Sequence, residues 1–364
     1  MTETERPTNS ETLQPFSSIA VVGVGQTGGY FLREIAFYSK RLAGIQTYGI
    51  VRSVPDVRPV YIDHQVKLSD NPTEVLGSER PPQLVIVTVP IHEVAAALQP
   101  FTEYDGDVTI LLTQNGVGTG ELAQQVLRNR PNIRVVRGSL FTSVSYKPDG
   151  SLEYDHERRQ IAFAPVPLPG QDDDKVYEEA HRLRRFFDSL GHQTHVLEDF
   201  KSMEWTKLLA NSFGRSMIAT GKLPSETFND PDYYRREVES FLARAHAMHK
   251  AGIRIEYFPW LNLRSLERQL KLVHRSRMDA APVMGARIRG KVSRAYTKSR
   301  GDIPPAAARK WYEDHELDPE ILEYALPFIH LADQFNCPAP FVDHMVKEWY
   351  QWKETQRQLL ESAK

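Results

Sequence analysis

Three glycines near the N-terminus have the spacing of a phosphate-binding turn. The sequence Gly-Val-Gly-Gln-Thr-Gly follows a short apolar stretch, SIAVV, and precedes a helical pattern that begins near Tyr30. In such a turn the first glycine allows the bend, the second lets the backbone approach a pyrophosphate, and the third lets helix and strand pack closely. Free N–H groups at the start of the helix then face the phosphates. We therefore predict a dinucleotide-binding turn made of Gly23, Val24, Gly25, Gln26, Thr27 and Gly28. The alternative is a strand–helix turn without a ligand.

The end of the next strand bears on which dinucleotide binds. Enzymes that use NAD usually place Asp or Glu there, where the carboxylate accepts the ribose hydroxyls. This stretch, IQTYGIV, ends instead on Arg52 and Ser53. A guanidinium and a hydroxyl suit a 2′-phosphate through charge-assisted hydrogen bonds. The pair predicts NADP(H) as the cofactor, the alternative being an ordinary surface arginine.

A stripe of polar side chains lies on a predicted helix in the second half of the chain. Lys207, Asn211 and Arg215 are spaced four residues apart, which places them on one helix face. An ammonium, an amide and a guanidinium could together hold an anionic keto acid. Taken alone, the spacing fits a solvated stripe equally well.

The elements that must position these residues fall into two groups. Up to about residue 198, apolar β-branched strands alternate with helical patterns, which is typical of a mostly parallel sheet with helices on both faces. Beyond Asp199 almost every pattern is helical. We predict a disordered tail over 1–16, an α/β Rossmann-type NADP-binding domain over 17–198 and an all-α substrate domain over 199–364.

Composition excludes several classes of protein. The net charge of −2 gives no field that favours nucleic acid, and no apolar run reaches the length of roughly 20 residues that a membrane span needs. The single cysteine, Cys337, fits a reducing compartment, and the polar start carries no secretory signal, so we expect a cytoplasmic protein. His246 and His249 have helical spacing but no third ligand, so no metal site is expected. Neither a nucleophile elbow nor a P-loop is present.

The chain after the tail resembles the ketopantoate reductase family. The matching pieces occur in the family's order: the glycine turn, Arg52, the segment Gln114-Asn115-Gly116, and the helix Glu204 to Asn211 that contains Lys207. Glu320 is matched by its distance to Pro340, because the family's active-site glutamate lies about 20 residues before a proline. The resemblance implies an NADP-dependent oxidoreductase that reduces a small 2-keto acid, with 2-dehydropantoate to pantoate, a step of pantothenate biosynthesis, as the family's reaction.

The resemblance also implies roles for individual residues. Lys207 would be the general acid, Glu320 and Asn211 would bind and orient the substrate, and Asn115 would lie between nicotinamide and substrate. This assignment makes chemical sense, because hydride addition to a ketone builds negative charge on oxygen, which an ammonium can stabilise and protonate.

Three positions depart from the family's pattern. Pro90 stands where the family usually has a lysine, Arg215 replaces a second asparagine, and Ser299 is only a weak match for a substrate-binding serine. We therefore also consider a relative that reduces a different carbonyl or an imine, and a non-catalytic NADP-binding protein. The expected partner is a small keto acid as substrate. The oligomeric state that we consider is a homodimer.

Overall fold

The computed structural model describes residues 16–39, 44–52, 66–147, 151–155, 157–213, 223–276, 282–300 and 319–337. The described residues of Met1–Gln114 and Thr119–Phe200 form one compact unit, here called the α/β unit. Those of Asn115–Gly118 and Lys201–Lys364 form a second, the helical unit. The chain thus passes to the second unit next to the predicted boundary at Asp199. Ser53 and Arg215, two of the predicted site residues, lie outside the described residues.

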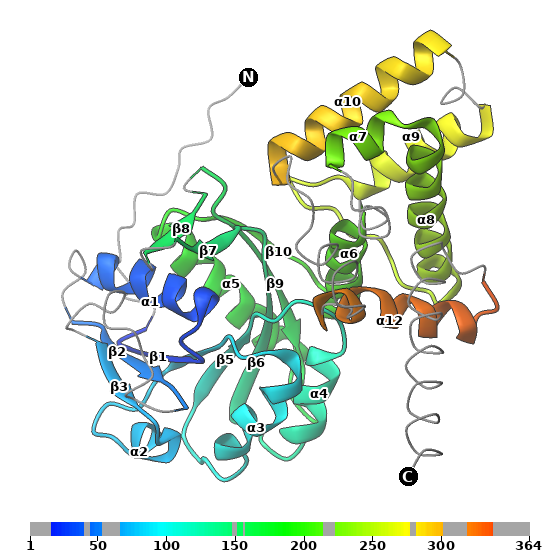
Figure 1. Cartoon of the computed structure of the whole chain (residues 1–364). Helices are drawn as coiled ribbons and strands as arrows, with labels where there is room; N and C mark the ends of the chain where they lie inside the picture. Colours follow the sequence, from blue (N-terminus) through cyan, green and yellow to red (C-terminus); the bar gives the residue numbers. More distant parts are fainter. Residues whose placement is uncertain are drawn as a thin grey trace, which may run out of the picture. The chain divides into compact units, whose positions relative to one another are not determined.

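An eight-stranded sheet forms the centre of the α/β unit (Figure 1). The order is β10-β9-β6-β5-β4-β1-β2-β3; the pairs are parallel except that β9 runs antiparallel to β6. Its strands are β1 (Ser18–Val22), β2 (Gln46–Ile50), β3 (Val66–Ser69), β4 (Leu84–Val87), β5 (Val108–Leu112), β6 (Ile133–Leu140), β9 (Gln160–Val166) and β10 (Gln193–Val196). The predicted class, a mostly parallel sheet with a helical second part, is confirmed.

Helices cover both faces of this sheet, because alternate side chains of each strand enter different cores. In β1, Ala20 and Val22 belong to one cluster with Val94 of α3, while Ile19 and Val21 belong to the other with Phe31 of α1. Strands that are buried on both faces carry nearly continuous apolar runs, and this is why SIAVV, LVIV and VTILL each contain at most one polar residue. The helices are α1 (Gln26–Ser39), α2 (Pro72–Leu76), η3 (Ile91–Glu93), α3 (Val94–Leu98), η4 (Gln99–Thr102), α4 (Thr119–Val126) and α5 (Asp173–Ser189). A small hairpin, β7 (Val144–Tyr146) with β8 (Leu152–Tyr154), pairs apart from the main sheet.

The helical unit has its own apolar core. Trp205 of α6 (Phe200–Ser212) packs edge-on against Phe328 of α12 (Pro319–Gln334), with 5.3 Å between ring centroids. The helices among its described residues are α6 (Phe200–Ser212), α7 (Pro224–Asn229), α8 (Pro231–Lys250), α9 (Leu263–Ser276), α10 (Pro282–Arg300) and α12 (Pro319–Gln334). Within the described part of the chain, no helix is long and apolar enough to cross a bilayer.

Phe16 corrects the predicted extent of the tail. We placed residue 16 in the disordered segment, but its side chain is fully buried. Its ring meets that of Phe186 edge-on at 5.4 Å, and the Arg182 guanidinium carbon lies 4.1 Å from its centroid. Burying an aromatic side chain stabilises a fold by about 1.5–3 kcal/mol, enough to order the residue that precedes β1. Residues 1–15 and 53–65 lie outside the described residues.

Candidate functional site

The glycine turn joins β1 to α1 at the carboxyl edge of the sheet. Gly23 adopts φ +88°, a left-handed conformation that favours glycine, and its N–H donates to the carbonyl of Ile50 over 2.9 Å. The hydroxyl of Thr88, just after β4, donates to the carbonyl of Gly23 and to that of Val22. The turn is therefore held from β2 and from β4, on both sides of β1.

The last two glycines of the turn differ in the space around them. A Cβ atom at Gly28 would lie 1.9 Å from the carbonyl oxygen of Gly23, so no larger residue fits there. A Cβ atom at Gly25 would meet no protein atom within 4 Å. Packing within the protein therefore explains Gly28 but not Gly25. Open space beside an exposed backbone, at the start of α1, fits the approach of a pyrophosphate.

Arg52 follows β2 at the same edge of the sheet and meets a carboxylate there. Its Nη2 atom lies 2.5 Å from Oε1 of Glu93, which ends η3 just after β4. The Arg52 side chain is 83% exposed and that of Glu93 31%, so solvent reaches both charges. His92 Nε2 lies 3.6 Å from the same Glu93 oxygen. The guanidinium that we predicted to meet a 2′-phosphate is thus paired with an acidic side chain in the protein alone.

The loop that carries Asn115 is held by a buried carboxylate of the helical unit. Gly116 and Gly118 both have positive φ, +93° and +87°, and these two glycines allow the sharp bends of residues 115–118. The N–H of Gly118 donates to Oε2 of Glu204 over 2.8 Å, and Val117 packs against the helical core. Glu204 is only 3% exposed and lies on α6, three residues before Lys207. The same short helix therefore holds the Asn115 loop and presents the lysine, while Asn115 itself is exposed.

Within the α/β unit, Arg137 supports the residue before this loop. Its guanidinium donates to the carbonyl of Leu112 over 2.6 Å and to that of Gln114 over 2.5 Å. The Gln114 side chain donates in turn to the carbonyl of Val87 over 2.9 Å. Arg137 lies on β6 and is 2% exposed. Buried hydrogen bonds of this kind fix the end of β5 from which the loop departs.

Lys207 and Asn211 lie on α6, and neither belongs to a solvated stripe. Lys207 is 9% exposed and Asn211 is half-buried. The adjacent face of α6 is also covered, because the hydroxyl of Thr206 accepts the N–H of Glu256 over 2.8 Å. A lysine that is largely withdrawn from water is tolerated where its charge meets a partner or a ligand.

The remaining predicted site residues are located only by element. Glu320 is the second residue of α12, and Ser299 is the last but one of α10. Both therefore belong to the helical unit.

A polar cluster lies beneath α1, away from the turn. Glu34 accepts from Arg159 and from the Tyr154 hydroxyl, each over 2.8 Å, and the Tyr30 hydroxyl lies 2.7 Å from Nε2 of His192. Burial lowers the pKa of His192 to about 4, with a further contribution from the Arg159 guanidinium. Burial also raises the pKa of Tyr154 to about 12. The side chains of His192 and Tyr154 are therefore uncharged near pH 7, as expected of a structural cluster.

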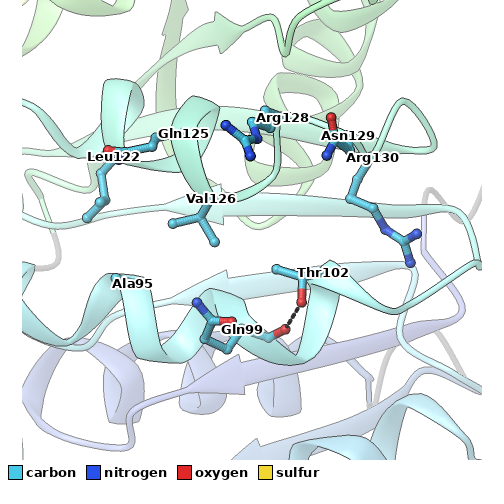
Figure 2. A pocket seen from close by; sticks show the side chains of 9 residues that line it. All are labelled: Ala95, Gln99, Thr102, Leu122, Gln125, Val126, Arg128, Asn129 and Arg130. Atoms are coloured by element: carbon cyan, nitrogen blue, oxygen red, sulfur yellow. Dashed lines mark hydrogen bonds between the residues drawn. The ribbon is translucent and has the colours of Figure 1, made fainter.

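Figure 2 shows a groove between α3–η4 and α4, with a volume of about 600 Å³. Amide side chains and two arginines line it, together with a few apolar groups: Ala95, Gln99, Thr102, Leu122, Gln125, Val126, Arg128, Asn129 and Arg130. None of the predicted site residues is among them. The groove contains neither a carboxylate nor a lysine, so it lacks a general acid for ketone reduction.

Comparison with known families decides what this arrangement belongs to. Residues 19–167, which include the glycine turn, Arg52 and the Asn115 loop, match the model of the family described as ketopantoate reductase PanE/ApbA. This part of the chain is therefore similar to a ketopantoate reductase domain. The resemblance inferred from the sequence is thereby confirmed, and the family is one of oxidoreductases. A comparison with curated proteins gives no match.

Solved structures extend the likeness to the ketopantoate reductase fold over nearly the whole chain. A PanE/ApbA family ketopantoate reductase from Ralstonia eutropha JMP134 aligns with a TM-score of 0.61 at 14% identity, covering 94% of this chain and 99% of that one. D-mandelate dehydrogenase with NADH and anilino(oxo)acetate gives 0.60 at 13%, covering 93% and 99%. A dimeric ketopantoate reductase from Staphylococcus aureus gives 0.57 at 14%, covering 93% and 99%. At these identities the likeness establishes the fold.

Three residues that contact predicted site elements were not identified from the sequence. Glu204 stands inside a motif quoted only for its lysine and asparagine, and a glutamate on a helix ordinarily indicates solvent. Glu93 and Arg137 reach their contacts across strands that are far apart in the sequence. A signal existed only for Glu204, as an acidic residue between the apolar Met203 and Trp205.

Proposed function

We propose that this protein is an NADPH-dependent reductase that converts a small 2-keto acid to a 2-hydroxy acid. The observation that carries the proposal is Lys207, a residue only 9% exposed, which lies on α6 in the same unit as the Asn115 loop. Glu204 joins the two, because its carboxylate accepts the N–H of Gly118. A buried lysine beside an anchored amide loop suits a reaction in which oxygen gains charge and then a proton.

The residues of the α/β unit fit a dinucleotide. The open space at Gly25 and the start of α1 would hold the pyrophosphate, and Arg52 would meet the 2′-phosphate. NADPH, when bound, supplies the hydride. The structural neighbour D-mandelate dehydrogenase was solved with NADH, which supports a nicotinamide cofactor for this fold.

The residues of the helical unit are assigned to the substrate. Lys207 would donate the proton to the carbonyl oxygen, while Asn211 and Glu320 would orient the keto acid and Asn115 would lie next to the nicotinamide. The neighbours are named for ketopantoate and for mandelate, a 2-keto and a 2-hydroxy acid. We propose 2-dehydropantoate first and other small branched or aromatic 2-keto acids next. Arg215 would take part in binding the carboxylate, and Ser299 would contact the substrate.

A panel of 2-keto acids tests the proposal directly. The purified protein is mixed with NADPH and each acid in turn, 2-dehydropantoate and phenylglyoxylate included, and the loss of NADPH absorbance is followed. We expect turnover with at least one acid and a hydroxy-acid product by mass spectrometry. Tight NADPH binding without turnover of any acid would favour the non-catalytic alternative.

One observation favours a second substrate class. Pro90, where the family usually has a lysine, is exposed at the start of η3 and offers neither a charge nor an N–H donor. A carbonyl or imine that needs no cation at this position would then be the substrate. The same panel, extended to cyclic imines and 2-keto esters, distinguishes the two substrate classes. The cytoplasmic location, the role in pantothenate biosynthesis and the homodimer stay predictions.

A further inference from the structure

Glu93 brings a carboxylate to the end of β2, where an NAD-dependent enzyme usually has one, although it lies in η3, after β4. In most NAD sites the ribose-binding acid ends the second strand, but here that strand ends on Arg52. Glu93 lies 41 residues later, in the short helix after β4. Its carboxylate nevertheless reaches the end of β2, since Oε1 is 2.5 Å from Arg52 Nη2.

We infer that Glu93 makes the adenosine end of the site accept NADH as well as NADPH, and so limits the preference that Arg52 confers. The inference rests on the proposed dinucleotide function and names its specificity determinant. With NADH, the carboxylate accepts the ribose hydroxyls while Arg52 stays paired with it. With NADPH, the phosphate attracts Arg52 and repels Glu93, so the ion pair separates.

Exposure and neighbouring charges allow both arrangements. Arg52 is 83% exposed and Glu93 31%, so each side chain can rotate away without leaving a buried charge unpaired. His92 Nε2, 3.6 Å from Glu93 Oε1, offers the carboxylate a second partner once Arg52 has left. An exposed ion pair is worth up to a factor of about five in an equilibrium constant, and the repulsion between carboxylate and phosphate adds to this.

Dissociation constants of both cofactors test the inference without any substrate. Glu93→Gln keeps the size and an acceptor oxygen but removes the charge. We expect the Kd for NADPH to fall about three- to tenfold and the Kd for NADH to rise a few-fold. Glu178→Gln is the matched control: Glu178 is exposed on α5, which packs on β9 and β10 at the opposite end of the sheet. It loses the same charge and should leave both constants unchanged.

Arg52→Ala separates failure of this inference from failure of the proposed function. Suppose that Arg52→Ala weakens the binding of NADPH selectively, but Glu93→Gln changes neither dissociation constant, or changes both by the same factor. Glu93 then does not set cofactor specificity, while the NADPH site itself stands. If the wild-type protein binds neither cofactor, the proposed function and this inference fall together. A shift of the same size in the control variant would assign the effect to net charge and overturn the inference.

Discussion

Lys207 is the residue on which the proposed chemistry depends, and its burial gives that proposal a physical footing. An exposed lysine on an amphipathic helix loses nothing by staying solvated, but a lysine that is 9% exposed has given up most of its hydration. Such a position is retained where the charge meets a partner or a substrate. The helix that carries it also anchors the Asn115 loop.

Replacing Lys207 by methionine should remove catalysis and leave the cofactor in place. Methionine keeps the buried apolar stem while removing the proton donor, so packing is preserved. We expect kcat to fall by about 10²–10⁴-fold with the Kd for NADPH within twofold of wild type, as measured by steady-state kinetics and cofactor titration. Lys201→Met is the control, since Lys201 lies on the same helix but is exposed. Near-full turnover in Lys207→Met would end the assignment.

At the scale of elements, the β1–α1 turn separates two uses of glycine. Gly28→Ala should destabilise the α/β unit by about 3 kcal/mol, because the new methyl group would overlap the Gly23 carbonyl oxygen. Gly25→Val should leave the unfolding transition close to wild type and abolish dinucleotide binding, because its side chain would enter the space assigned to the pyrophosphate. Chemical denaturation and NADPH titration of both variants check this. Undiminished NADPH affinity in Gly25→Val would contradict the assignment of the turn.

The contact between the Asn115 loop and α6 makes a second prediction at this scale. Glu204→Leu leaves the N–H of Gly118 without its acceptor and should cost about 1–3 kcal/mol of stability. It should also raise KM for the keto acid several-fold more than it lowers kcat, because Asn115 is then less well placed. Glu204→Gln keeps an acceptor oxygen and should restore most of both.

Tryptophan fluorescence suits the stability measurement, because all five tryptophans come after residue 200 in the sequence, on the same side of the unit boundary as Glu204. A loss of stability without the change in KM would make Glu204 purely structural.

For the whole molecule, the buried cluster beneath α1 predicts a loss of stability in mild acid. The pKa of His192 is about 4 in the folded protein against 6.5 when exposed, so the unfolded chain binds the extra proton between these values. Stability therefore falls as pH drops from 6.5 towards 4, by about 3 kcal/mol in all for roughly 2.5 pKa units.

Urea unfolding followed by circular dichroism at pH 7 and pH 4.5 checks this, with His192→Gln as the comparison. The variant has lower stability at both pH values but lacks this titration. The change in the free energy of unfolding between pH 7 and pH 4.5 should be smaller in the variant than in wild type by about 2–3 kcal/mol. Equal differences for the two proteins would show that His192 is not held neutral.

Hydrophobic periodicity and glycine spacing in the sequence were enough to predict the fold class and the β1–α1 turn. Two-sided apolar runs specify a covered parallel sheet, since only strands buried on both faces need them. The spacing of Gly23, Gly25 and Gly28 predicts their turn, although only Gly28 is required by a residue close to it in the sequence, the Gly23 carbonyl. The tail was misjudged at Phe16, because its burial depends on Phe186, which is 170 residues away.

The tertiary structure alone decided the contacts made across strands. The Arg52 side chain could be read from the sequence, but its carboxylate partner could not, because β2 and β4 each pair with β1 and so bring the segments that follow them to one sheet edge. Likewise, helical spacing placed Lys207 on one helix face with Asn211, but the spacing is the same whether that face is exposed or buried. Burial is a sum over contacts with distant segments, and so only the folded chain distinguishes a surface lysine from a candidate proton donor.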